Sequence, residues 1–297
     1  MPAKSNLDEL RNARNKRREN IRTWSSYRKL IRQFFEERRF LEIVSPILVK
    51  NPGLEPHLDY FETESLPSSM LSNSETEKFF LPTSPEYHLK KVLGLGEERI
   101  FELAHCFRNG EKSPQHNFEF FMLEWYRSPG KMSEIHQDCI ELFVFLSEHL
   151  APEKKNFFQN TNSVSLKEIF WNRWKIDLKE SVFNHDQFKD NCLKNMLISE
   201  SDSHLDESFE DLFNRVFVQH IERDLGKMGP TFLWDFPAPL AALSKIDPIE
   251  KEFCHRFEVY IQGFEVANCF GEETDPNLLR KKCQEDLVHR KAMNRVC

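Results

Sequence analysis

Hydrophobic and polar positions along the chain alternate between helical spacing and short extended runs. Within residues 24–39 the apolar positions fall on one helical face, at Leu30, Ile31, Phe34 and Phe35. Residues 40–44 form a continuous run that ends at Ser45-Pro46, which is typical of a strand. Residues 132–150 and 209–225 return to the helical spacing. The pattern therefore predicts helices and strands mixed along one chain.

Two pairs of extended runs predict antiparallel hairpins. The pairs are residues 100–107 with 118–126, and residues 256–261 with 264–268. A polar, turn-prone segment, 109–117, joins the first pair, and Gln262-Gly263 joins the second. Shorter apolar runs at 79–81 and 231–236 predict two further strands. Strands in antiparallel pairs, separated by helices, indicate an α+β fold.

Composition narrows the class of protein without identifying it. The 297 residues are 39% hydrophobic and 30% charged, as in an ordinary soluble globular protein with one sizeable core. No apolar run approaches the length of a membrane span, so we expect no membrane contact. The net charge of −7 argues against broad coating of nucleic acid. The net charge does not exclude a single acidic partner that binds to a local basic patch.

The N-terminal residues and the cysteines point to a reducing compartment. Residues 1–22 are basic and lack the apolar stretch of a secretory signal, so we expect a solvated basic helix ahead of a core at 23–297. Seven cysteines without a CxxC pair favour free thiols over disulfides, which suggests a cytoplasmic protein. The histidines show no metal-binding spacing, so no structural metal is expected.

Residues 107–127 carry the most specific pattern in the chain, FRNGEKSPQHNFEFFMLEWYR. The sequence closely resembles motif 2 of class II aminoacyl-tRNA synthetases in the lysyl branch. Its ending, Leu-Glu-Trp-Tyr-Arg at 123–127, resembles the elongation factor P lysyltransferases of that branch. Upstream, the helix, strand and proline of residues 24–46 resemble motif 1, which builds the dimer interface in that family. The resemblance implies a six- or seven-stranded, mainly antiparallel sheet flanked by helices, in a homodimer.

The resemblance assigns ATP-binding roles to residues of motif 2. Arg108 matches the arginine that bridges the substrate carboxylate and the α-phosphate, a task suited to a planar guanidinium. Phe120 matches the ring that stacks on adenine, and His116 matches a donor to the distal phosphates. Asn109 and Asn117 match polar contacts to the nucleotide. Arg108 is accordingly the candidate catalytic residue.

A second group of residues matches the family's binding site for lysine. Ser84-Pro85-Glu86 begins a predicted helix, and this segment is open to two interpretations. Ser84 is a natural helix cap with Pro85 at the first helical position. The segment also resembles the amino-acid-binding loop, in which Glu86 would hold the α-ammonium. Glu124 and Tyr126 would surround the lysine side chain, because a buried ammonium requires carboxylate partners.

The second hairpin supplies the remaining candidate residues. Its sequence, RFEVYIQGFEVANCFGE at 256–272, resembles the strand pair that carries the family's ATP and magnesium ligands. Glu258 and Glu265 match the ligands of ATP-bound Mg²⁺. Asn268 matches a polar contact to the substrate, and Glu272 matches the acid that recognises the lysine ε-ammonium. Taken without the resemblance, Glu258, Glu265 and Glu272 would be interpreted as solvent-exposed residues at strand edges, with no function.

The resemblance as a whole implies an enzyme that uses ATP and Mg²⁺ to activate lysine or β-lysine as an adenylate. The acceptor implied is a lysine of elongation factor P, because the anticodon-binding barrel of lysyl-tRNA synthetases has no room before residue 24. Charging of tRNA is therefore not expected. Residues 274–295 resemble the helix before motif 3, but no Gly-x-x-x-Gly-x-Asp-Arg segment follows, which predicts a core incomplete at its C-terminal end.

Local departures and whole-protein alternatives stay open from the sequence. Gly110 replaces a glutamate of the family, and Glu111 is a candidate to fill that role. Three other functions are compatible with the sequence. The protein could be a lysyl-tRNA synthetase paralogue, or a catalytically inactive relative that only binds a ligand or partner. It could also be a truncated chain that does not fold stably.

Overall fold

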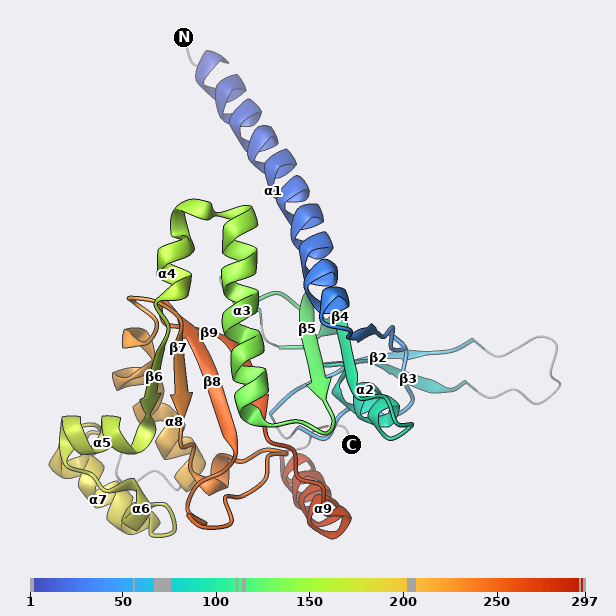
Figure 1. Cartoon of the computed structure of the whole chain (residues 1–297). Coiled ribbons are helices and arrows are strands. Elements are labelled where there is room, and N and C mark those ends of the chain that lie inside the picture. Colours follow the sequence, from blue (N-terminus) through green and yellow to red (C-terminus); the bar gives the residue numbers. More distant parts are fainter. Residues whose placement is uncertain are drawn as a thin grey trace. The chain divides into compact units, whose positions relative to one another are not determined.

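The structure, a computed structural model, describes residues 3–55, 57–66, 76–110, 112–113, 116–201, 207–293 and 295. The chain forms two compact units (Figure 1). Unit 1 comprises residues 1–130 and 280–297, and unit 2 comprises residues 131–279. Among the helices in these described ranges, none combines the length and apolar character needed to cross a membrane.

Unit 1 is built from a long helix, a strand hairpin and smaller elements. Its elements are α1 (Ala3–Glu37), β1 (Leu41–Glu42), β2 (Phe61–Glu64), β3 (Lys78–Leu81), α2 (Glu86–Leu93), β4 (Arg99–Phe107) and β5 (Glu119–Arg127). The final helix, α9 (Pro276–Ala292), has residues in both units. β1 runs parallel to β4, and β4 pairs with β5 antiparallel from Arg99↔Arg127 to Phe107↔Glu119. β2 and β3 form a separate antiparallel pair.

One face of the β4–β5 hairpin is covered by α1. Phe35 of α1 is fully buried and stacks on Phe101 of β4 with ring centroids 4.7 Å apart. Trp24 packs against Phe121 of β5 with the rings tilted and their centroids 4.9 Å apart. Since side chains alternate along a strand, the even-numbered residues of β5 point to the opposite face. That opposite face carries Phe120, Glu124 and Tyr126, three of the site residues predicted from motif 2.

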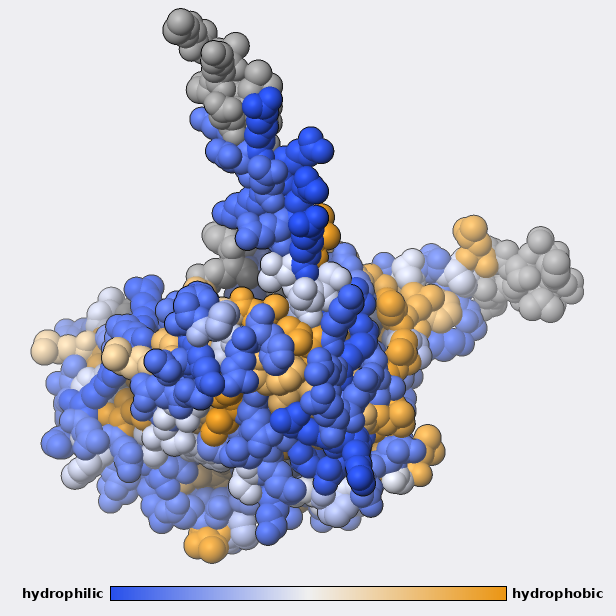
Figure 2. Space-filling model, turned by 45° about the horizontal axis from the view of Figure 1, so that its top comes forward, coloured by the Kyte–Doolittle hydropathy of each residue, from blue (hydrophilic) through white to orange (hydrophobic). Residues whose placement is uncertain are grey.

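The N-terminal turns of α1 are exposed to solvent. Side chains of residues 11–23 are exposed, and Figure 2 shows that this part of the helix is hydrophilic. The predicted boundary between a basic extension and the core, at residue 22, lies inside this continuous helix. The chain therefore passes from solvent to the core without a break in secondary structure.

Unit 2 contains a four-stranded sheet with helices on both faces. Its helices are α3 (Met132–Leu150), α4 (Lys155–Gln159), α5 (Leu166–Trp174), α6 (Leu178–Ser181), α7 (His185–Lys194) and α8 (Phe209–His220), with 3-10 turns η1 (Pro152–Lys154), η3 (Glu222–Asp224) and η4 (Ala238–Leu240). Its strands are β6 (Asn162–Ser165), β7 (Thr231–Trp234), β8 (Arg256–Ile261) and β9 (Phe264–Phe270), paired in the order β6-β7-β8-β9. β6 is parallel to β7, and the other pairs are antiparallel.

The two faces of this sheet pack against different helices. On one face the sheet is covered by α3 (Figure 1). His136 of this helix contacts the rings of Phe232 and Phe257. On the other face, Leu233 and Tyr260 join a buried cluster formed mainly by α5 to α8. The sheet is therefore a buried central layer whose strand ends and hairpin carry the polar candidates.

Most predicted elements are found, and the differences are local. Both predicted hairpins are confirmed, and the helix expected at 132–150 is found with those bounds. The strand expected at 40–44 is reduced to the two residues of β1. Hydrogen bonding groups the described strands into sheets of three, two and four strands, so no one of these sheets reaches the expected six or seven. An α+β architecture with mainly antiparallel pairing is confirmed.

Candidate active site

Arg108 lies at the base of the loop that closes the β4–β5 hairpin. Its main-chain N–H donates to the carbonyl oxygen of Phe118 at 3.0 Å, which joins the two ends of the loop. Its guanidinium carbon lies 5.3 Å from the centroid of the Phe120 ring. The predicted phosphate-binding cation and the predicted adenine-stacking ring are therefore in direct contact.

Arg108 and Glu124 both influence the pKa of the buried Cys106 thiol, so both charged groups lie near this residue. Burial, with a smaller contribution from the negative charge of Glu124, raises the pKa of the Cys106 thiol to about 12, and Arg108 opposes the shift. Cys106 lies opposite Phe120 in the hairpin, and Glu124 lies on the same face four residues along β5. This face carries a cation and a carboxylate close to a buried thiol.

Glu124 and Tyr126 form a pair on β5. The Tyr126 hydroxyl donates to Glu124 Oε1 at 2.6 Å, and both side chains are half-buried. Residues two apart on a strand face the same way, which explains the contact. The hydrogen bond holds the carboxylate in one orientation, as a binding site for an ammonium group requires.

Glu86 is fixed at the start of α2. The Ser84 hydroxyl accepts the main-chain N–H of Glu86 at 3.1 Å, but the N-cap residue is Pro85, so the predicted N-cap role of Ser84 is wrong. The helix itself begins at Glu86, and Pro85 is the flanking residue rather than the first helical one. The Glu86 carboxylate pairs with Lys90 one turn later, at 2.7 Å. Glu86 is thus both oriented by the helix start and partly neutralised.

A carboxylate that the sequence did not single out lies beside these residues. Burial raises the pKa of Glu55, and the charge of Glu86 adds to this effect, whereas Arg108 and Arg290 oppose it. Glu55 therefore lies within electrostatic reach of two predicted site residues. It stands in a loop rich in proline and glycine, 51–56, where a single acid gives no functional signal.

The described residues of the first hairpin's loop, 109–110, 112–113 and 116–117, are exposed, and several of them make local hydrogen bonds. The Asn109 N–H donates to the carbonyl oxygen of Asp59 at 3.0 Å. His116 Nδ1 lies 3.0 Å from the Ser113 hydroxyl, and the exposed side chain of Asn117 follows. Gly110 has a φ of +83°, which explains why a glutamate is disfavoured there. Glu111, the proposed replacement, lies outside the described residues.

In unit 2, Glu258 is a buried carboxylate with two partners on its own strand. It accepts hydrogen bonds from the Arg256 guanidinium and from the Tyr260 hydroxyl, the latter at 2.5 Å. All three side chains lie on one face of β8. These two hydrogen bonds replace part of the hydration that the buried carboxylate has lost.

A β-bulge in the second hairpin decides which residues face Glu258. The pairs Ile261↔Phe264 and Tyr260↔Glu265 follow a regular two-residue turn, but the next pair is Val259↔Ala267. This extra residue in β9 places Asn268 opposite Glu258. In an uninterrupted register Asn268 would lie opposite Phe257 and face the other way. The bulge thus puts Asn268 on the face that carries Glu258.

The predicted magnesium ligands flank one tyrosine. Burial raises the pKa of Tyr260, and the charges of Glu258, Glu265 and Glu222 raise it further. Carboxylate oxygens are the hard donors that Mg²⁺ prefers, and this ion commonly takes one or two of them together with phosphate oxygens. In the described ranges no three His, Cys, Asp or Glu side chains gather as a metal group. Glu258 and Glu265 fit a nucleotide-bound ion better than a protein-only metal site.

Glu272 follows β9, where the chain is held by its neighbours. It forms an isolated bridge with Ser244, and the adjacent Gly271 N–H donates to the His255 carbonyl oxygen at 2.7 Å. A Cβ on Gly271 would come within 2.9 Å of the His255 Cβ, so only glycine fits here. The close approach fixes the position of Glu272.

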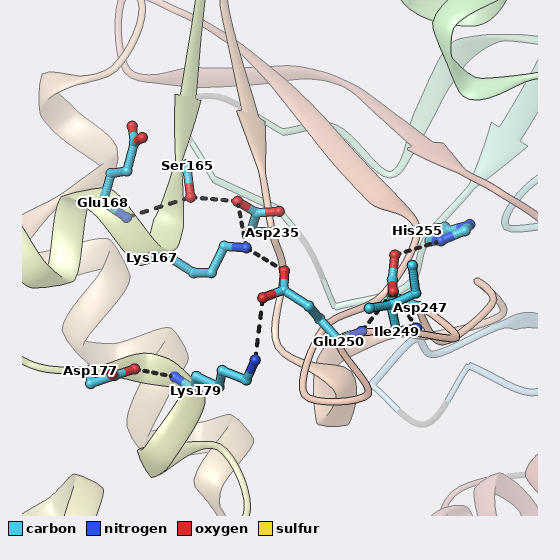
Figure 3. A network of polar contacts seen from close by, with 10 residues as sticks. All are labelled: Ser165, Lys167, Glu168, Asp177, Lys179, Asp235, Asp247, Ile249, Glu250 and His255. Atoms are coloured by element: carbon cyan, nitrogen blue, oxygen red, sulfur yellow. Dashed lines mark hydrogen bonds and ion pairs between the residues drawn. The ribbon is translucent and has the colours of Figure 1, made fainter.

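A network of charged side chains supports the segment before β8 (Figure 3). Lys167 bridges Glu250 at 2.7 Å and Asp235 at 3.6 Å. Further on, Asp247 accepts the main-chain N–H groups of Ile249 and Glu250 and lies 3.1 Å from His255 Nε2. These contacts hold His255, which in turn holds Gly271.

Comparison with known proteins identifies the family. The chain matches the family described as tRNA synthetases class II (D, K and N) over residues 4–295. It therefore belongs to this family of class II synthetase-like proteins. Among curated proteins it is similar to an elongation factor P--(R)-beta-lysine ligase of Buchnera aphidicola, with 32% identity over 265 residues, which are 89% of this chain and 76% of that protein.

Two further relatives carry related names. The elongation factor P--(R)-beta-lysine ligase of Klebsiella pneumoniae subsp. pneumoniae is 33% identical over 262 residues, covering 88% of this chain and 76% of that protein. The homolog of this ligase from Aquifex aeolicus is 32% identical over 267 residues, covering 90% of this chain and 83% of that protein. The resemblance inferred from motif 2 is thus confirmed at the level of the family.

Proposed function

We propose that this protein is an ATP-dependent ligase that activates lysine or β-lysine and transfers it to a lysine of elongation factor P. The names of the relatives in Buchnera, Klebsiella and Aquifex support this choice of acceptor. The observation that carries the proposal is the arrangement of side chains on one face of β4 and β5. Arg108 contacts Phe120 there, and Arg108 and Glu124 both influence the pKa of the Cys106 thiol. Such a face can position a nucleotide next to an ammonium group.

Arg108 is proposed to bind the α-phosphate and the substrate carboxylate. Adenylation needs the carboxylate oxygen held in line with the α-phosphorus, and it needs the growing charge neutralised. A guanidinium donates to both groups without taking part in covalent chemistry. Phe120 would stack on adenine in place of its present contact with Arg108. His116, Asn109 and Asn117 are proposed contacts to the nucleotide.

Glu258 and Glu265 are proposed to hold Mg²⁺ with ATP. The bound ion would neutralise charge on the departing pyrophosphate. The chain's own contribution is the orientation of the two carboxylates. The Tyr260 hydroxyl fixes Glu258, and the pairing of Tyr260 with Glu265 sets the second carboxylate beside it.

Selection of lysine is proposed to depend on carboxylates placed for ammonium groups. Ser84 and the helix start orient Glu86 for the amino group near the reacting end. Glu124, held by Tyr126, is the proposed partner of the ε-ammonium. From the family resemblance, Glu272 and Asn268 are also proposed as lysine-binding residues. A shorter neutral side chain would leave these groups unpaired, which is the physical basis for rejecting it.

A homodimer is the proposed assembly. Residues 41–48 expose several large apolar side chains in one short segment: Leu41 at 48%, Val44 at 87%, Ile47 at 49% and Leu48 at 49%. Contiguous exposed apolar residues commonly mark a protein interface. The segment corresponds to the motif that resembles the family's dimer interface. The cytoplasm is the proposed location, because the six cysteines that the structure describes carry free thiols.

Transfer of radiolabelled lysine and (R)-β-lysine to purified elongation factor P tests the acceptor. The same preparation is offered tRNA in a parallel reaction. The proposal predicts label on the protein and not on the tRNA. Efficient charging of tRNA, with no label on elongation factor P, would favour a lysyl-tRNA synthetase paralogue instead.

A further inference from the structure

The loop that carries Glu55 is anchored through its main chain. Arg290 of α9 is fully buried, and its Nη1 donates to the carbonyl oxygens of Glu55 at 2.6 Å and Leu58 at 2.7 Å. The Arg290 guanidinium also lies 4.4 Å from the centroid of the Tyr60 ring. Buried arginines are uncommon, so this one holds the loop at a defined position.

Two tyrosines fix the same loop on the other side of Glu55. The Tyr60 hydroxyl donates to the carbonyl oxygen of Gly53. The Tyr87 hydroxyl, from α2, accepts the main-chain N–H of Leu54 at 3.4 Å. Because Tyr87 follows Glu86 in the chain, the loop is tied to the helix that carries the proposed ammonium-binding residue.

The side chain of Glu55 is packed tightly against Gly53. A Cβ added to Gly53 would lie 2.1 Å from Glu55 Oε2 and 2.9 Å from Oε1. Within the described part of the chain Glu55 Oε2 is shielded from solvent and has no hydrogen-bond partner. The glycine therefore makes room for a carboxylate whose Oε2 atom has no hydrogen-bond partner in the surrounding protein.

A structural role does not account for such a carboxylate. Burying a charged oxygen without a partner costs stability, and glutamine has almost the same shape without the charge. Burial is the largest cause of the raised pKa of Glu55; Glu86 adds to it by repulsion, and Arg108 and Arg290 offset part of it. The groups that face Glu55 are Glu86 and Tyr87 from α2, Arg108 from the hairpin and Arg290 from α9. A cationic ligand would supply the hydrogen-bond partner that Glu55 Oε2 lacks.

We propose that Glu55 is a further lysine-binding residue, which accepts a hydrogen bond from the ammonium group nearest the reacting carboxylate and shares that group with Glu86. The inference rests on the proposed function and adds a residue to it. Arg108 lies within electrostatic reach of Glu55, so the carboxylate of a bound amino acid would meet a cation near the carboxylates that bind its ammonium group. Gly53 is a positioning residue that keeps the Glu55 carboxylate in place.

The test compares KM values for lysine, (R)-β-lysine and ATP in pyrophosphate exchange by the full chain. Glu55→Gln is expected to raise the KM of the preferred amino acid about 10- to 100-fold, as for loss of a hydrogen bond to a charged group, and to leave the KM of ATP within about 3-fold. Glu64→Gln, on exposed β2, is the matched control and is expected to change neither value. An unchanged KM for the preferred amino acid in Glu55→Gln would overturn the inference.

Gly53→Ala provides a second variant that keeps the carboxylate. The φ of Gly53 lies outside the left-handed region, so alanine fits the main chain and only displaces the Glu55 side chain. We expect Gly53→Ala to raise the same KM in the wild-type background and to have no further effect in Glu55→Ala, where the space is free. Equal effects in both backgrounds would contradict a role through Glu55.

The wild-type chain separates failure of the two proposals. Lysine-dependent exchange by wild type, with unaltered KM values in Glu55→Gln and Gly53→Ala, would reject the role of Glu55 and keep the proposed function. Absence of exchange and of lysine binding in the wild-type chain would reject the proposed function, and the role of Glu55 with it.

Discussion

Arg290 Nη1 donates to the carbonyl oxygen of Glu55 at 2.6 Å, across 235 positions in the sequence. The contact joins α9 to the loop before β2, within unit 1. Its consequence is that the position of the Glu55 carboxylate depends on a helix near the other end of the chain. The loop and α9 are therefore expected to respond together to mutation.

Replacing Arg290 tests this coupling. Arg290→Met removes the donor to two carbonyl oxygens and is expected to lower the free energy of unfolding by about 2–4 kcal/mol, as for lost hydrogen bonds to a charged group. Because the loop is released, the KM for the amino acid should rise as well. Chemical denaturation and exchange kinetics measure the two effects. Arg280→Met, at an exposed position of α9, is the control and should change stability by less than about 0.5 kcal/mol.

The pH dependence of stability distinguishes a binding carboxylate from a structural one. The pKa of Glu55 is raised above its ordinary value of 4.5, mainly by burial, so the folded chain holds the proton to a higher pH than the unfolded chain does. Stability is therefore lost as pH rises from about 4.5 through the folded-state pKa. Glu55→Gln should be more stable than wild type at neutral pH and show a flatter pH profile. Lower stability of Glu55→Gln at neutral pH would instead indicate a structural role.

Mutation of the two proposed magnesium ligands should reduce the stability of the fold by different amounts. Glu265 is exposed, so Glu265→Gln is expected to reduce exchange about 10²- to 10³-fold and change stability by less than about 0.5 kcal/mol. Glu258 is buried and paired with Arg256, so Glu258→Gln should lose activity and also about 3–5 kcal/mol of stability. Denaturation and exchange assays on both variants measure this difference. Full activity in Glu265→Gln would remove that residue from the proposed site.

If the exposed apolar segment 41–48 forms the dimer interface, a charged residue introduced into it should prevent dimer formation. Val44 is 87% exposed, and Val44→Asp would place a carboxylate within the proposed interface. We expect wild type to be a dimer and Val44→Asp to be a monomer in size-exclusion chromatography with light scattering. Leu66→Asp, at an exposed position outside the segment, should remain dimeric. A dimeric Val44→Asp, or a monomeric wild type, would contradict the interface.

Local pattern was sufficient to predict the secondary structure around the site. The alternation in residues 100–107 and 118–126, with a polar segment between them, predicted the β4–β5 hairpin. The helical spacing of 132–150 predicted α3 with its bounds. These features depend on neighbours in the sequence, which is why periodicity detects them. The short β1 differs because its length is set by pairing with β4, a tertiary contact.

The features that the sequence did not reveal depend on contacts between distant residues. Glu55 becomes notable only because Arg290 and Tyr87 fix its loop. Asn268 was predicted as a substrate contact from the family resemblance alone, but its place opposite Glu258 depends on the bulge in β9. Nothing in the hairpin sequence marks the extra residue. The proposed chemical roles of these residues stay predictions until their variants are measured.

The most direct measurement of the central claim is exchange of labelled pyrophosphate into ATP by the purified chain, with lysine or (R)-β-lysine added. Formation of an adenylate requires ATP, the amino acid and a positioned α-phosphate, so the assay tests the proposed activation step before any acceptor is involved. We predict exchange that depends on one of the two amino acids and is lost in Arg108→Ala. A folded chain that binds ATP but shows no exchange with either amino acid would contradict the proposed activation of lysine.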